Sequence, residues 1–326
     1  MFDALSAGSM DPVWDVIIVG GGPAGLNAAL LLGRCRRSVL LIDDGKPRNG
    51  VSHASHGVFT RDGEAPGELR RIAREQLRLY GVVVQEDTVV RARCAADTFE
   101  IDTANGDRQT ARKLLLATGL VDKLPDVPGL ESCYGRSVFS CPYCDGWEVR
   151  DRPLAVLAQG RAGIDLALGL TTWSRDLVLC TNGWSRLSQT DRHALRAHAV
   201  ALRTARVVRI DQVGGYVERI VFADGQMLPR SAIFIATEAR QRSDLARALG
   251  CEFNLKGAVN TGKLQRAGPY GLFVAGDAAR EANFIGVAAA EGLKAAYAIN
   301  LELREEFSAR LRAQSAQPSA AADARQ

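Results

Sequence analysis

Residues 15–43 place a strand, a glycine-rich turn, a helix and a second strand in close succession. The run Asp15–Val19 (DVIIV) is typical of a buried strand, and the turn Gly20–Gly25 (GGGPAG) follows it directly. A predicted helix over Leu26–Arg34 and a predicted strand over Ser38–Ile42 come next, and the second strand ends at Asp43. This order predicts a βαβ unit with parallel strands, and therefore a fold of the α/β class.

The GGGPAG turn has the glycine spacing of a dinucleotide-binding site. Gly20 suits the tight turn, Gly22 lets a pyrophosphate approach the backbone, and Gly25 lets the helix pack closely on the strand. Asp43 follows at the distance where an acid binds ribose hydroxyls, whereas Asp44 would point to the opposite face of the strand. A glycine turn that serves only packing is the alternative. We predict a nucleotide site that contains Gly20, Gly22, Pro23, Ala24, Gly25 and Asp43.

A second motif, CPYCDG, separates Cys141 from Cys144 by two residues. Two cysteines at this spacing can close a small, reducible disulfide ring, and a thiolate that opens a helix is stabilised by unpaired N–H groups. Half of a zinc site and an inert coincidence are the alternatives. Zinc needs further Cys or His ligands at short spacing, and the remaining cysteines are scattered singly, so we predict no metal. Asp145 is expected either to carry protons for the thiols or to stabilise the helix start.

A second βαβ-like unit follows the cysteine motif, with strands over Leu154–Leu157 and Leu177–Cys180 and a helix over Ile164–Thr172. Its turn has Ala158 and Gln159 where the first turn has glycines, so a side chain is expected where a pyrophosphate would approach. The segment after the second strand offers neither an acid for a ribose nor an arginine cluster for a 2′-phosphate. The chain therefore has one intact and one eroded dinucleotide site, and we expect one tightly held cofactor.

Two further segments end in small residues suited to cofactor contact. A buried strand that begins at Lys113 runs into Ala117-Thr118-Gly119, and Gly271–Val274 runs into Ala275-Gly276-Asp277. Asp277 is placed to hold hydroxyl groups of a cofactor, although an N-cap role is equally simple. A small-residue helix is predicted over Val287–Leu303.

Composition excludes several classes of protein. The net charge of +4 comes from separated arginines with no dense basic block, which gives no support for nucleic-acid binding. No stretch approaches the apolar length of a membrane span, and the odd number of cysteines, 7, indicates a reducing compartment such as the cytoplasm. Residues 1–12 are expected to be a flexible leader and residues 311–326 a disordered tail.

Taken in order, these motifs resemble the low-molecular-weight thioredoxin reductase family of flavoproteins, from about Val13 to Leu303. The resemblance implies two Rossmann-like, doubly wound dinucleotide-binding domains, one non-covalent FAD per chain and a homodimer. It assigns residues 13–124 and 246–310 to a discontinuous FAD domain, and residues 125–245 to an inserted NADPH-type domain that carries the CxxC pair. The FAD contacts it implies include Ala117, Thr118, Gly119, Gly276 and Asp277.

The inserted domain departs from true thioredoxin reductases, which makes NADPH doubtful as electron donor. The version CPYCDGWE, together with Arg48, Asn49 and His56, resembles the FAD-dependent dithiol oxidases of holomycin, gliotoxin and romidepsin-type biosynthesis. That branch implies disulfide formation in a small-molecule dithiol, with O₂ as acceptor. It also implies that Cys141 exchanges with substrate and Cys144 faces the flavin. We expect Arg48, Asn49 and His56 to contact the cofactor, and a surface or core role is the alternative for His56. A disulfide reductase and a catalytically silent FAD-binding regulator are the alternatives.

Overall fold

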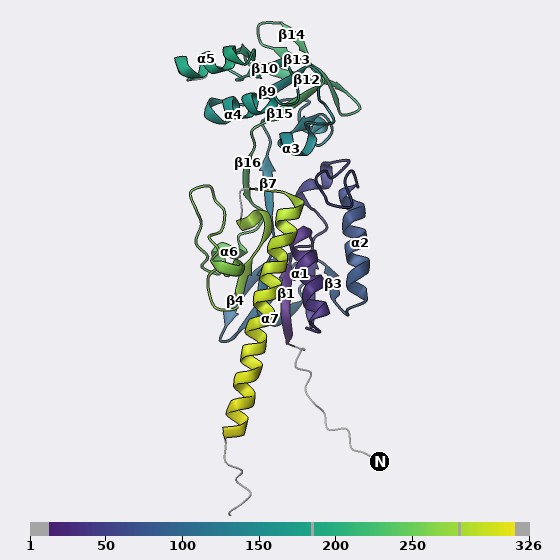
Figure 1. Cartoon of the computed structure of the whole chain (residues 1–326), viewed down its shortest axis with the longest axis vertical. Helices are drawn as coiled ribbons and strands as arrows, with labels where there is room; N and C mark the ends of the chain where they lie inside the picture. Colours follow the sequence, from purple (N-terminus) through teal and green to yellow (C-terminus); the bar gives the residue numbers. More distant parts are fainter. Residues whose placement is uncertain (1–12, 184–185, 280–281, 317–326) are drawn as a thin grey trace, which may run out of the picture. The chain divides into compact units, whose positions relative to one another are not determined.

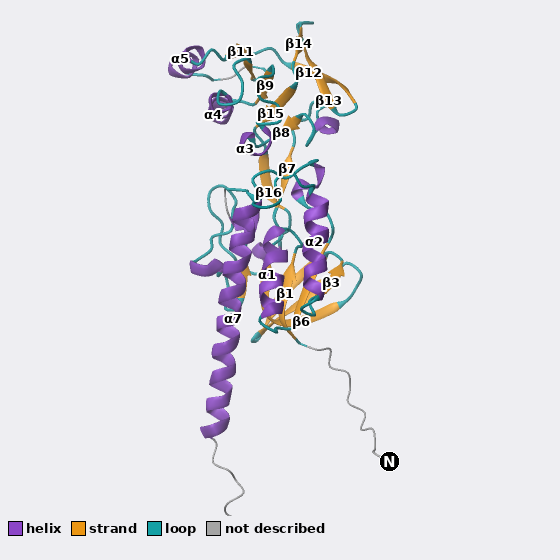
Figure 2. Cartoon of the chain, turned by 45° about the vertical axis from the view of Figure 1, so that its right-hand side comes forward, coloured by secondary structure: helices purple, strands orange, loops and turns teal. Residues whose placement is uncertain are grey.

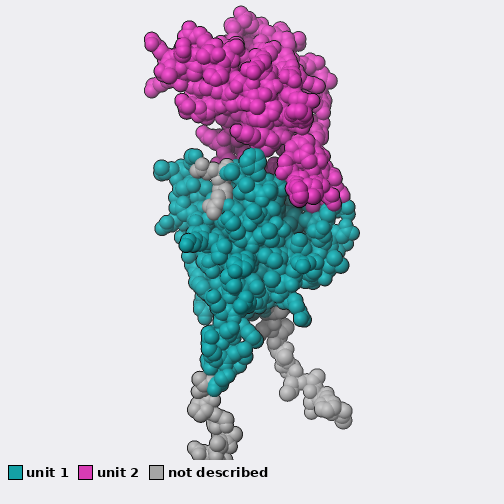
Figure 3. Space-filling view, viewed as in Figure 1, with its two compact units in different colours: residues 1–47, 70–120, 241–326 teal, residues 48–69, 121–240 magenta. Residues whose placement is uncertain are grey.

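The computed structural model describes residues 13–183, 186–279 and 282–316, so the expected leader, residues 1–12, lies outside it. The chain divides into two compact units (Figure 3). Unit 1 comprises residues 1–47, 70–120 and 241–326, and unit 2 comprises residues 48–69 and 121–240. The segment 48–69 was expected in the FAD domain but groups with unit 2. One reason is close backbone packing, since a Cβ on Gly135 would lie 2.5 Å from the carbonyl oxygen of Val51.

A seven-stranded mixed sheet forms the centre of unit 1 (Figure 1). Its strands are β1 (Trp14–Val19), β2 (Val39–Asp43), β3 (Val83–Glu86), β4 (Val89–Ala95), β5 (Thr98–Thr103), β6 (Arg108–Leu116) and β17 (Leu272–Val274). The order β3-β2-β1-β6 is parallel, and β17 continues it in parallel beside the end of β6. β4 and β5 form a hairpin that pairs antiparallel with the start of β6. The carboxyl ends of β1, β2, β6 and β17 therefore share one edge of the sheet.

Helices from both ends of the chain cover one face of this sheet. α1 (Pro23–Arg34) and α7 (Ile285–Ala316) lie side by side, as Figures 1 and 2 both show. Their apolar residues pack on the alternate strand positions that include Val16 and Ile18, together with Leu77 of α2 (Pro66–Arg78). The other face of the sheet packs against α6 (Leu245–Ala248). The alternation of faces follows from the two-residue period of a strand.

A buried ion-pair cluster joins β6 to α7. The Lys113 side chain is only 1% exposed, and its Nζ lies 3.0 Å from Glu302 Oε2 and 2.6 Å from Glu306 Oε1. Lys113 Nζ also lies 3.8 Å from the ring centre of Tyr270, and Arg266 pairs with Glu302 at 2.8 Å. Burial acts to lower the pKa of Lys113, but its hydrogen bonds and attraction to Glu306 and Glu302 outweigh this effect and raise the pKa.

Three helices differ in extent from the sequence expectation. α1 begins at Pro23 rather than Leu26, because proline suits the first turn of a helix. α4 (Gly160–Leu170) also begins earlier than expected. α7 continues to Ala316, so the expectation of a disordered tail from residue 311 was wrong for residues 311–316. Strong helix formers (Leu, Glu, Arg and Ala) fill the end of this helix and favour its continuation.

Unit 2 contains a five-stranded parallel sheet in the order β11-β10-β9-β15-β8. Its strands are β8 (Val138–Phe139), β9 (Leu154–Leu157), β10 (Leu177–Cys180), β11 (Ala201–Arg203) and β15 (Ala232–Ile235). α4 packs on this sheet and contacts α5 (Gln189–Ala197). A three-stranded antiparallel sheet is formed by β12 (Val207–Val213), β13 (Tyr216–Phe222) and β14 (Met227–Pro229). The expected α/β fold with two Rossmann-type domains is confirmed.

Two short strands, β7 (Leu120–Lys123) and β16 (Glu238–Gln241), pair where the chain passes between the units. The remaining helical elements are η1 (Arg48–Val51), η2 (Glu131–Cys133), α3 (Pro142–Asp145), η3 (Lys263–Gln265) and η4 (Gly276–Ala279). Over the described ranges, none of the helices combines the length and apolar character that a membrane crossing requires.

Candidate functional site

The glycine turn of unit 1 lies where the ends of three parallel strands meet. Ala117 N donates to Val19 O at 2.8 Å, and Ala275 N donates to Leu116 O at 3.0 Å. These bonds bring the Gly20–Gly25 turn, the segment after β6 and the segment after β17 to one edge of the sheet. Ligands of doubly wound sheets bind at this edge, outside the carboxyl ends of the strands. The structure thus places three separately predicted motifs together.

Backbone geometry explains the glycines of this turn. Gly20 has φ +107°, and a Cβ there would lie 2.3 Å from Ala117 O, so no other residue fits. A Cβ on Gly25 would lie 1.9 Å from Gly20 O, which agrees with its expected packing role. Gly22 differs, because a Cβ there would meet no described atom within 4 Å. It is the N-cap of α1 without a side-chain cap, which leaves the helix N-terminus open to an anion.

Asp43 lies at the end of β2, turned toward this glycine turn. Its Oδ1 accepts a hydrogen bond from Gly21 N at 2.9 Å, and its Oδ2 accepts from Arg70 at 2.7 Å and Arg74 at 2.5 Å. Burial acts to raise the pKa of Asp43, but the Gly21 N–H and the two guanidinium groups outweigh it and lower the pKa. Asp44 is less buried and lies 4.0 Å from Arg242. The two arginines of α2 are partners that the sequence reading missed.

Glu291 supports the last of the three segments. Its Oε2 accepts a hydrogen bond from Gly276 N at 2.9 Å, and the Glu291 residue is only 4% exposed. Gly276 has φ +78°, and a Cβ there would lie 3.0 Å from Ala24 Cβ. The small residues of α1 and η4 therefore pack against each other, and a buried carboxylate on α7 fixes the backbone beside Asp277. No local sequence pattern identified Glu291.

The cysteine motif of unit 2 forms the short helix α3, directly after β8. Cys141 is the N-cap and Pro142 the first helical residue, and the structure joins Cys141 to Cys144 by a disulfide with a Cα–Cα distance of 5.3 Å. The backbone N–H groups of Cys144 and Asp145 each donate a hydrogen bond to Cys141 O, at 3.2 Å. Across the described part of the chain, no group of three or more His, Cys, Asp or Glu side chains is placed to hold a metal. The Cys141–Cys144 disulfide therefore closes a small ring that can be reduced.

Gly146 is required by the tight packing of this motif. A Cβ on Gly146 would lie 2.5 Å from Pro142 O and 2.8 Å from a ring atom of Trp173. The same Trp173 ring meets Tyr143 edge-on, with 5.6 Å between ring centres. Trp147 is 63% exposed, with the Arg150 guanidinium 3.8 Å above its ring. An aromatic surface therefore adjoins the cysteines within unit 2.

Three ionisable side chains gather around the end of α3. Burial, followed by repulsion from Glu148, raises the pKa of Asp145 to about 6, and His56 opposes this increase. His56 Nε2 lies 3.4 Å from Glu148 Oε1, and its Nδ1 lies 3.7 Å from Asp62 Oδ2. The sequence reading selected Asp145 and His56 separately but missed Glu148, although this residue lies within the CPYCDGWE motif.

Arg48 and Asn49, predicted as pocket residues, lie on η1 and group with unit 2. Arg48 forms a two-pronged ion pair with Asp122, at 2.6 and 2.9 Å. Asp122 also accepts a hydrogen bond from Tyr134 at 2.9 Å. Burial acts to raise the pKa of Asp122, but the Arg48 hydrogen bonds and charge lower it below its ordinary value. Arg48 thus holds the 48–69 segment to unit 2, and its expected cofactor contact stays a prediction.

The second nucleotide-type turn, between β9 and α4, has a different backbone from the first. The sequence reading placed the loss at Ala158 and Gln159, but in the G-x-G-x-x-G spacing Gly160 and Gly163 keep the second and third glycine positions. In unit 1 the glycine at the first position, Gly20, has positive φ. In unit 2 the positive φ, +61°, occurs instead at the second position, Gly160. Gln159 Nε2 donates to Thr181 O at 2.9 Å. A side chain therefore ties the turn to the end of β10.

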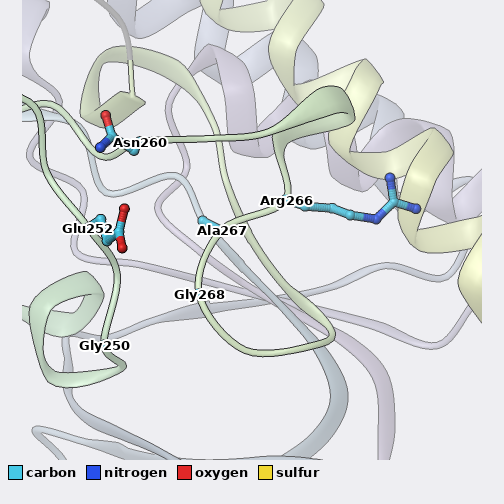
Figure 4. A pocket seen from close by; sticks show the side chains of 6 residues that line it. All are labelled: Gly250, Glu252, Asn260, Arg266, Ala267 and Gly268. Atoms are coloured by element: carbon cyan, nitrogen blue, oxygen red, sulfur yellow. The ribbon is translucent and has the colours of Figure 1, made fainter.

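A separate hollow of about 420 Å³ lies in unit 1 (Figure 4). It is lined by Gly250, Glu252, Asn260, Arg266, Ala267 and Gly268. Figure 4 shows the Arg266 side chain extending away from Glu252 and Asn260, in agreement with its bond to Glu302. None of the predicted site residues lines this hollow, so it plays no part in the predicted site.

Two Rossmann-type units, one with an open glycine cradle and the other with a reducible cysteine pair, define a disulfide oxidoreductase. The chain matches the family described as pyridine nucleotide-disulphide oxidoreductase over residues 14–292, and it belongs to that family. It is 32% identical to a probable thioredoxin reductase of Arthroderma benhamiae, over 90% of this chain and 81% of that one. Thioredoxin reductase tcpT of Claviceps purpurea is 34% identical over 82% and 88%, respectively. The solved structure of HlmI matches with TM-score 0.89 and 33% identity, over 95% and 99%.

These similarities confirm a thioredoxin reductase-like flavoprotein, a thiol:disulfide oxidoreductase that uses FAD. The residues present fit this cofactor. Gly22 and the uncapped start of α1 offer room and N–H groups for a pyrophosphate. Asp43 accepts three protein hydrogen bonds, and a carboxylate offers about four lone-pair sites, so one stays available for a ribose hydroxyl.

Proposed function

We propose that this enzyme is an FAD-dependent dithiol oxidase that forms an intramolecular disulfide in a small-molecule dithiol, with O₂ as final acceptor. The direction of electron flow rests on one observation, the altered turn of unit 2 in which Gln159 bonds to Thr181 O. A thioredoxin reductase needs this turn for NADPH. An enzyme that receives electrons from a dithiol does not.

The Cys141–Cys144 disulfide is the group that reacts with substrate. A substrate thiol loses its proton and attacks Cys141 Sγ, the Cys141–Cys144 bond breaks, and its electron pair leaves on Cys144. The second substrate thiol then attacks the first substrate sulfur, and Cys141 leaves with an electron pair. The substrate is oxidised by two electrons, and the cysteine pair is reduced by two. We assign the exchange role to Cys141 and the flavin-facing role to Cys144.

Asp145 is the proposed proton carrier. Its pKa of about 6 lets it take a proton from a thiol and release it near neutral pH. FAD, when bound, supplies the two-electron acceptor that returns the cysteine pair to its disulfide. Its proposed contacts are Gly20, Gly22, Pro23, Ala24, Gly25, Asp43, Ala117, Thr118, Gly119, Gly276 and Asp277.

The aromatic surface beside the cysteines supports a small apolar substrate. Tyr143 and Trp147 are exposed next to Cys144, and burying such rings against an apolar ligand is favourable. A homodimer is also part of the proposal. α7 exposes Tyr297, Phe307 and Leu311 along its length, which is apolar surface that a second copy would cover. Sedimentation of the holoprotein tests the assembly.

A disulfide reductase is the second candidate, because the curated relatives above are named as thioredoxin reductases. Purified holoprotein mixed with dithiothreitol in air separates the two functions. The oxidase should consume oxygen and form cyclic disulfide, and Cys144→Ser should abolish both. Rapid bleaching of the flavin by micromolar NADPH, without a response to dithiol, would overturn the oxidase and favour the reductase.

A further inference from the structure

Two separate segments of unit 2 place an imidazole between carboxylates next to the cysteine pair. Asp145 and Glu148 come from α3 and the turn after it, and His56 and Asp62 come from the loop between η1 and α2. His56 Nε2 lies 3.4 Å from Glu148 Oε1, and His56 Nδ1 lies 3.7 Å from Asp62 Oδ2. Each ring nitrogen therefore faces a different carboxylate.

Among these four groups, Asp62 is the most exposed to solvent. Asp145 is partly buried and directly follows Cys144. The His56 side chain is 23% exposed, that of Glu148 39%, and that of Asp62 71%. Asp62 is held in place because its Oδ1 accepts a hydrogen bond from Gly57 N at 2.7 Å. The series thus leads from the reacting cysteines to a fixed carboxylate in water.

We propose that Glu148, His56 and Asp62 form a proton path that connects Asp145 with solvent, and that Glu148 both carries the proton and holds His56 in place. The proposal deepens the proposed function, because it assigns a route to the protons that a dithiol loses. When the first thiol forms its bond to Cys141, its proton passes to the Asp145 carboxylate, while the electron pair of the broken disulfide leaves on Cys144. The Asp145 proton then leaves through Glu148 and His56 to Asp62, and Asp145 is ready for the second thiol.

Glu148 and His56 act on the pKa of Asp145 in opposite directions. The charges of Glu148 and His56 both act on Asp145, and the His56 ring lies beside Glu148 and Asp62. The negative charge of Glu148 disfavours ionisation of Asp145, whereas a positive charge on His56 favours it. Removing each charge should therefore move the ionisation of Asp145 in opposite senses. A merely structural role for these side chains would not produce this pair of shifts.

The test measures thiol reactivity in the reduced holoprotein, which does not depend on the direction of electron flow. Iodoacetamide alkylation of Cys141 is followed anaerobically from pH 4.5 to pH 9. We expect an inflection near pH 6 that disappears in Asp145→Asn. Glu148→Gln should move it down and His56→Gln should move it up, each by up to about one unit. Glu148→Asp should restore most of the original profile.

Glu131→Gln, a change at an exposed carboxylate of the same unit, is the matched control and should leave the profile unchanged. Equal profiles for all variants, or shifts of the same sign in Glu148→Gln and His56→Gln, would overturn the proton path. A second measurement, the anaerobic rate of flavin reduction by dithiothreitol, should fall in both variants and be recovered by Glu148→Asp. If the wild-type flavin is not reduced by any dithiol while the alkylation shifts still occur, the proposed function fails and the proton path stands.

Discussion

The side-chain amide of Gln159 donates a hydrogen bond to the main-chain oxygen of Thr181, and this bond links the turn after β9 to the end of β10. A dinucleotide bound in the usual way would place its pyrophosphate at this turn. In unit 1 the turn is linked to the end of β2 through its backbone, from Gly21 N to Asp43 Oδ1, and Gly22 stays open to approach. The two Rossmann-type units thus differ at the atoms that would contact a nucleotide.

Restoring glycines to this turn should improve NADPH binding. We expect the double change Ala158→Gly with Gln159→Gly to tighten binding roughly three- to tenfold, since a net hydrogen bond is worth about 1 kcal/mol. Isothermal titration with NADPH and the rate of flavin bleaching measure the effect. Gln226→Gly, at an exposed hairpin turn, is the control. Equal NADPH affinity in the wild type and the double variant would contradict the explanation.

Asp43→Asn should weaken FAD binding and destabilise unit 1. The change removes the charge that pairs with Arg70 and Arg74, and a lost charged hydrogen bond costs about 1.5–3 kcal/mol, or roughly 10- to 100-fold in affinity. Flavin fluorescence gives the dissociation constant, and thermal unfolding gives the stability. Asp44→Asn, one residue further on, should have little effect on either. Similar losses in the two variants would argue against a special role for Asp43.

The lowered pKa of Asp43 also has a consequence for stability against pH. The ordinary pKa is 3.8, and the folded value is lower, so the folded state binds the proton less tightly than the unfolded state. The stabilising contribution of Asp43 is therefore complete above pH 3.8 and is lost as the pH falls through the folded pKa. In Asp43→Asn this part of the acid-induced loss of stability should disappear. Urea unfolding between pH 3 and pH 6 measures it.

Gly146→Ala should destabilise the cysteine motif. The added Cβ would lie 2.5 Å from Pro142 O, and overpacking of this kind costs about 1–3 kcal/mol. Gly169→Ala is the matched control, because a Cβ there meets no described atom within 4 Å and alanine favours the helix by up to about 1 kcal/mol. Urea unfolding of both variants should give changes of opposite sign. A neutral Gly146→Ala variant would show that the backbone at Pro142 and the Trp173 ring can both shift to make room.

Lys113→Met should be strongly destabilising. The change leaves the buried carboxylate of Glu302 and the partly buried carboxylate of Glu306 without their lysine, and breaking a buried pair costs about 3–5 kcal/mol. Lys123→Met is the control, because Lys123 is 74% exposed and pairs with Glu238 at only 3.6 Å. Thermal unfolding of the two proteins should differ by several degrees. If the two behave alike, the cluster contributes no stability.

The sequence predicted those features that depend on neighbouring residues. The roles of Gly20, Gly25 and Asp43 follow from the order strand, turn, helix and strand, and the structure places all three accordingly. The bounds of β9 and β10 also agree with the expectation, because short apolar strands between turn residues have a clear pattern. The predictions of helix boundaries were less accurate, because caps and long-range packing decide where a helix begins and ends.

The missed features depend on contacts between distant parts of the chain. Arg70 and Arg74 on α2 reach Asp43 at the end of β2, and Glu291 on α7 reaches Gly276, so no local spacing indicates either pair. The grouping of residues 48–69 with unit 2 likewise depends on Arg48 and Asp122. The turn between β9 and α4 also keeps more of the glycine pattern than expected, because Gly160 and Gly163 occupy its second and third glycine positions.

The position of α7 has a consequence for how the protein is made. The glycine turn is synthesised long before the helix that packs on it: a Cβ on Gly292 would lie 2.0 Å from Ala24 O, so α7 packs directly on the start of α1. Until residues 272–316 are synthesised, the nascent chain lacks β17 and the helix that completes this core. We therefore expect FAD capture to wait until β17 and α7 have been synthesised, and ribosome-bound chains that end before β17 should not retain the flavin.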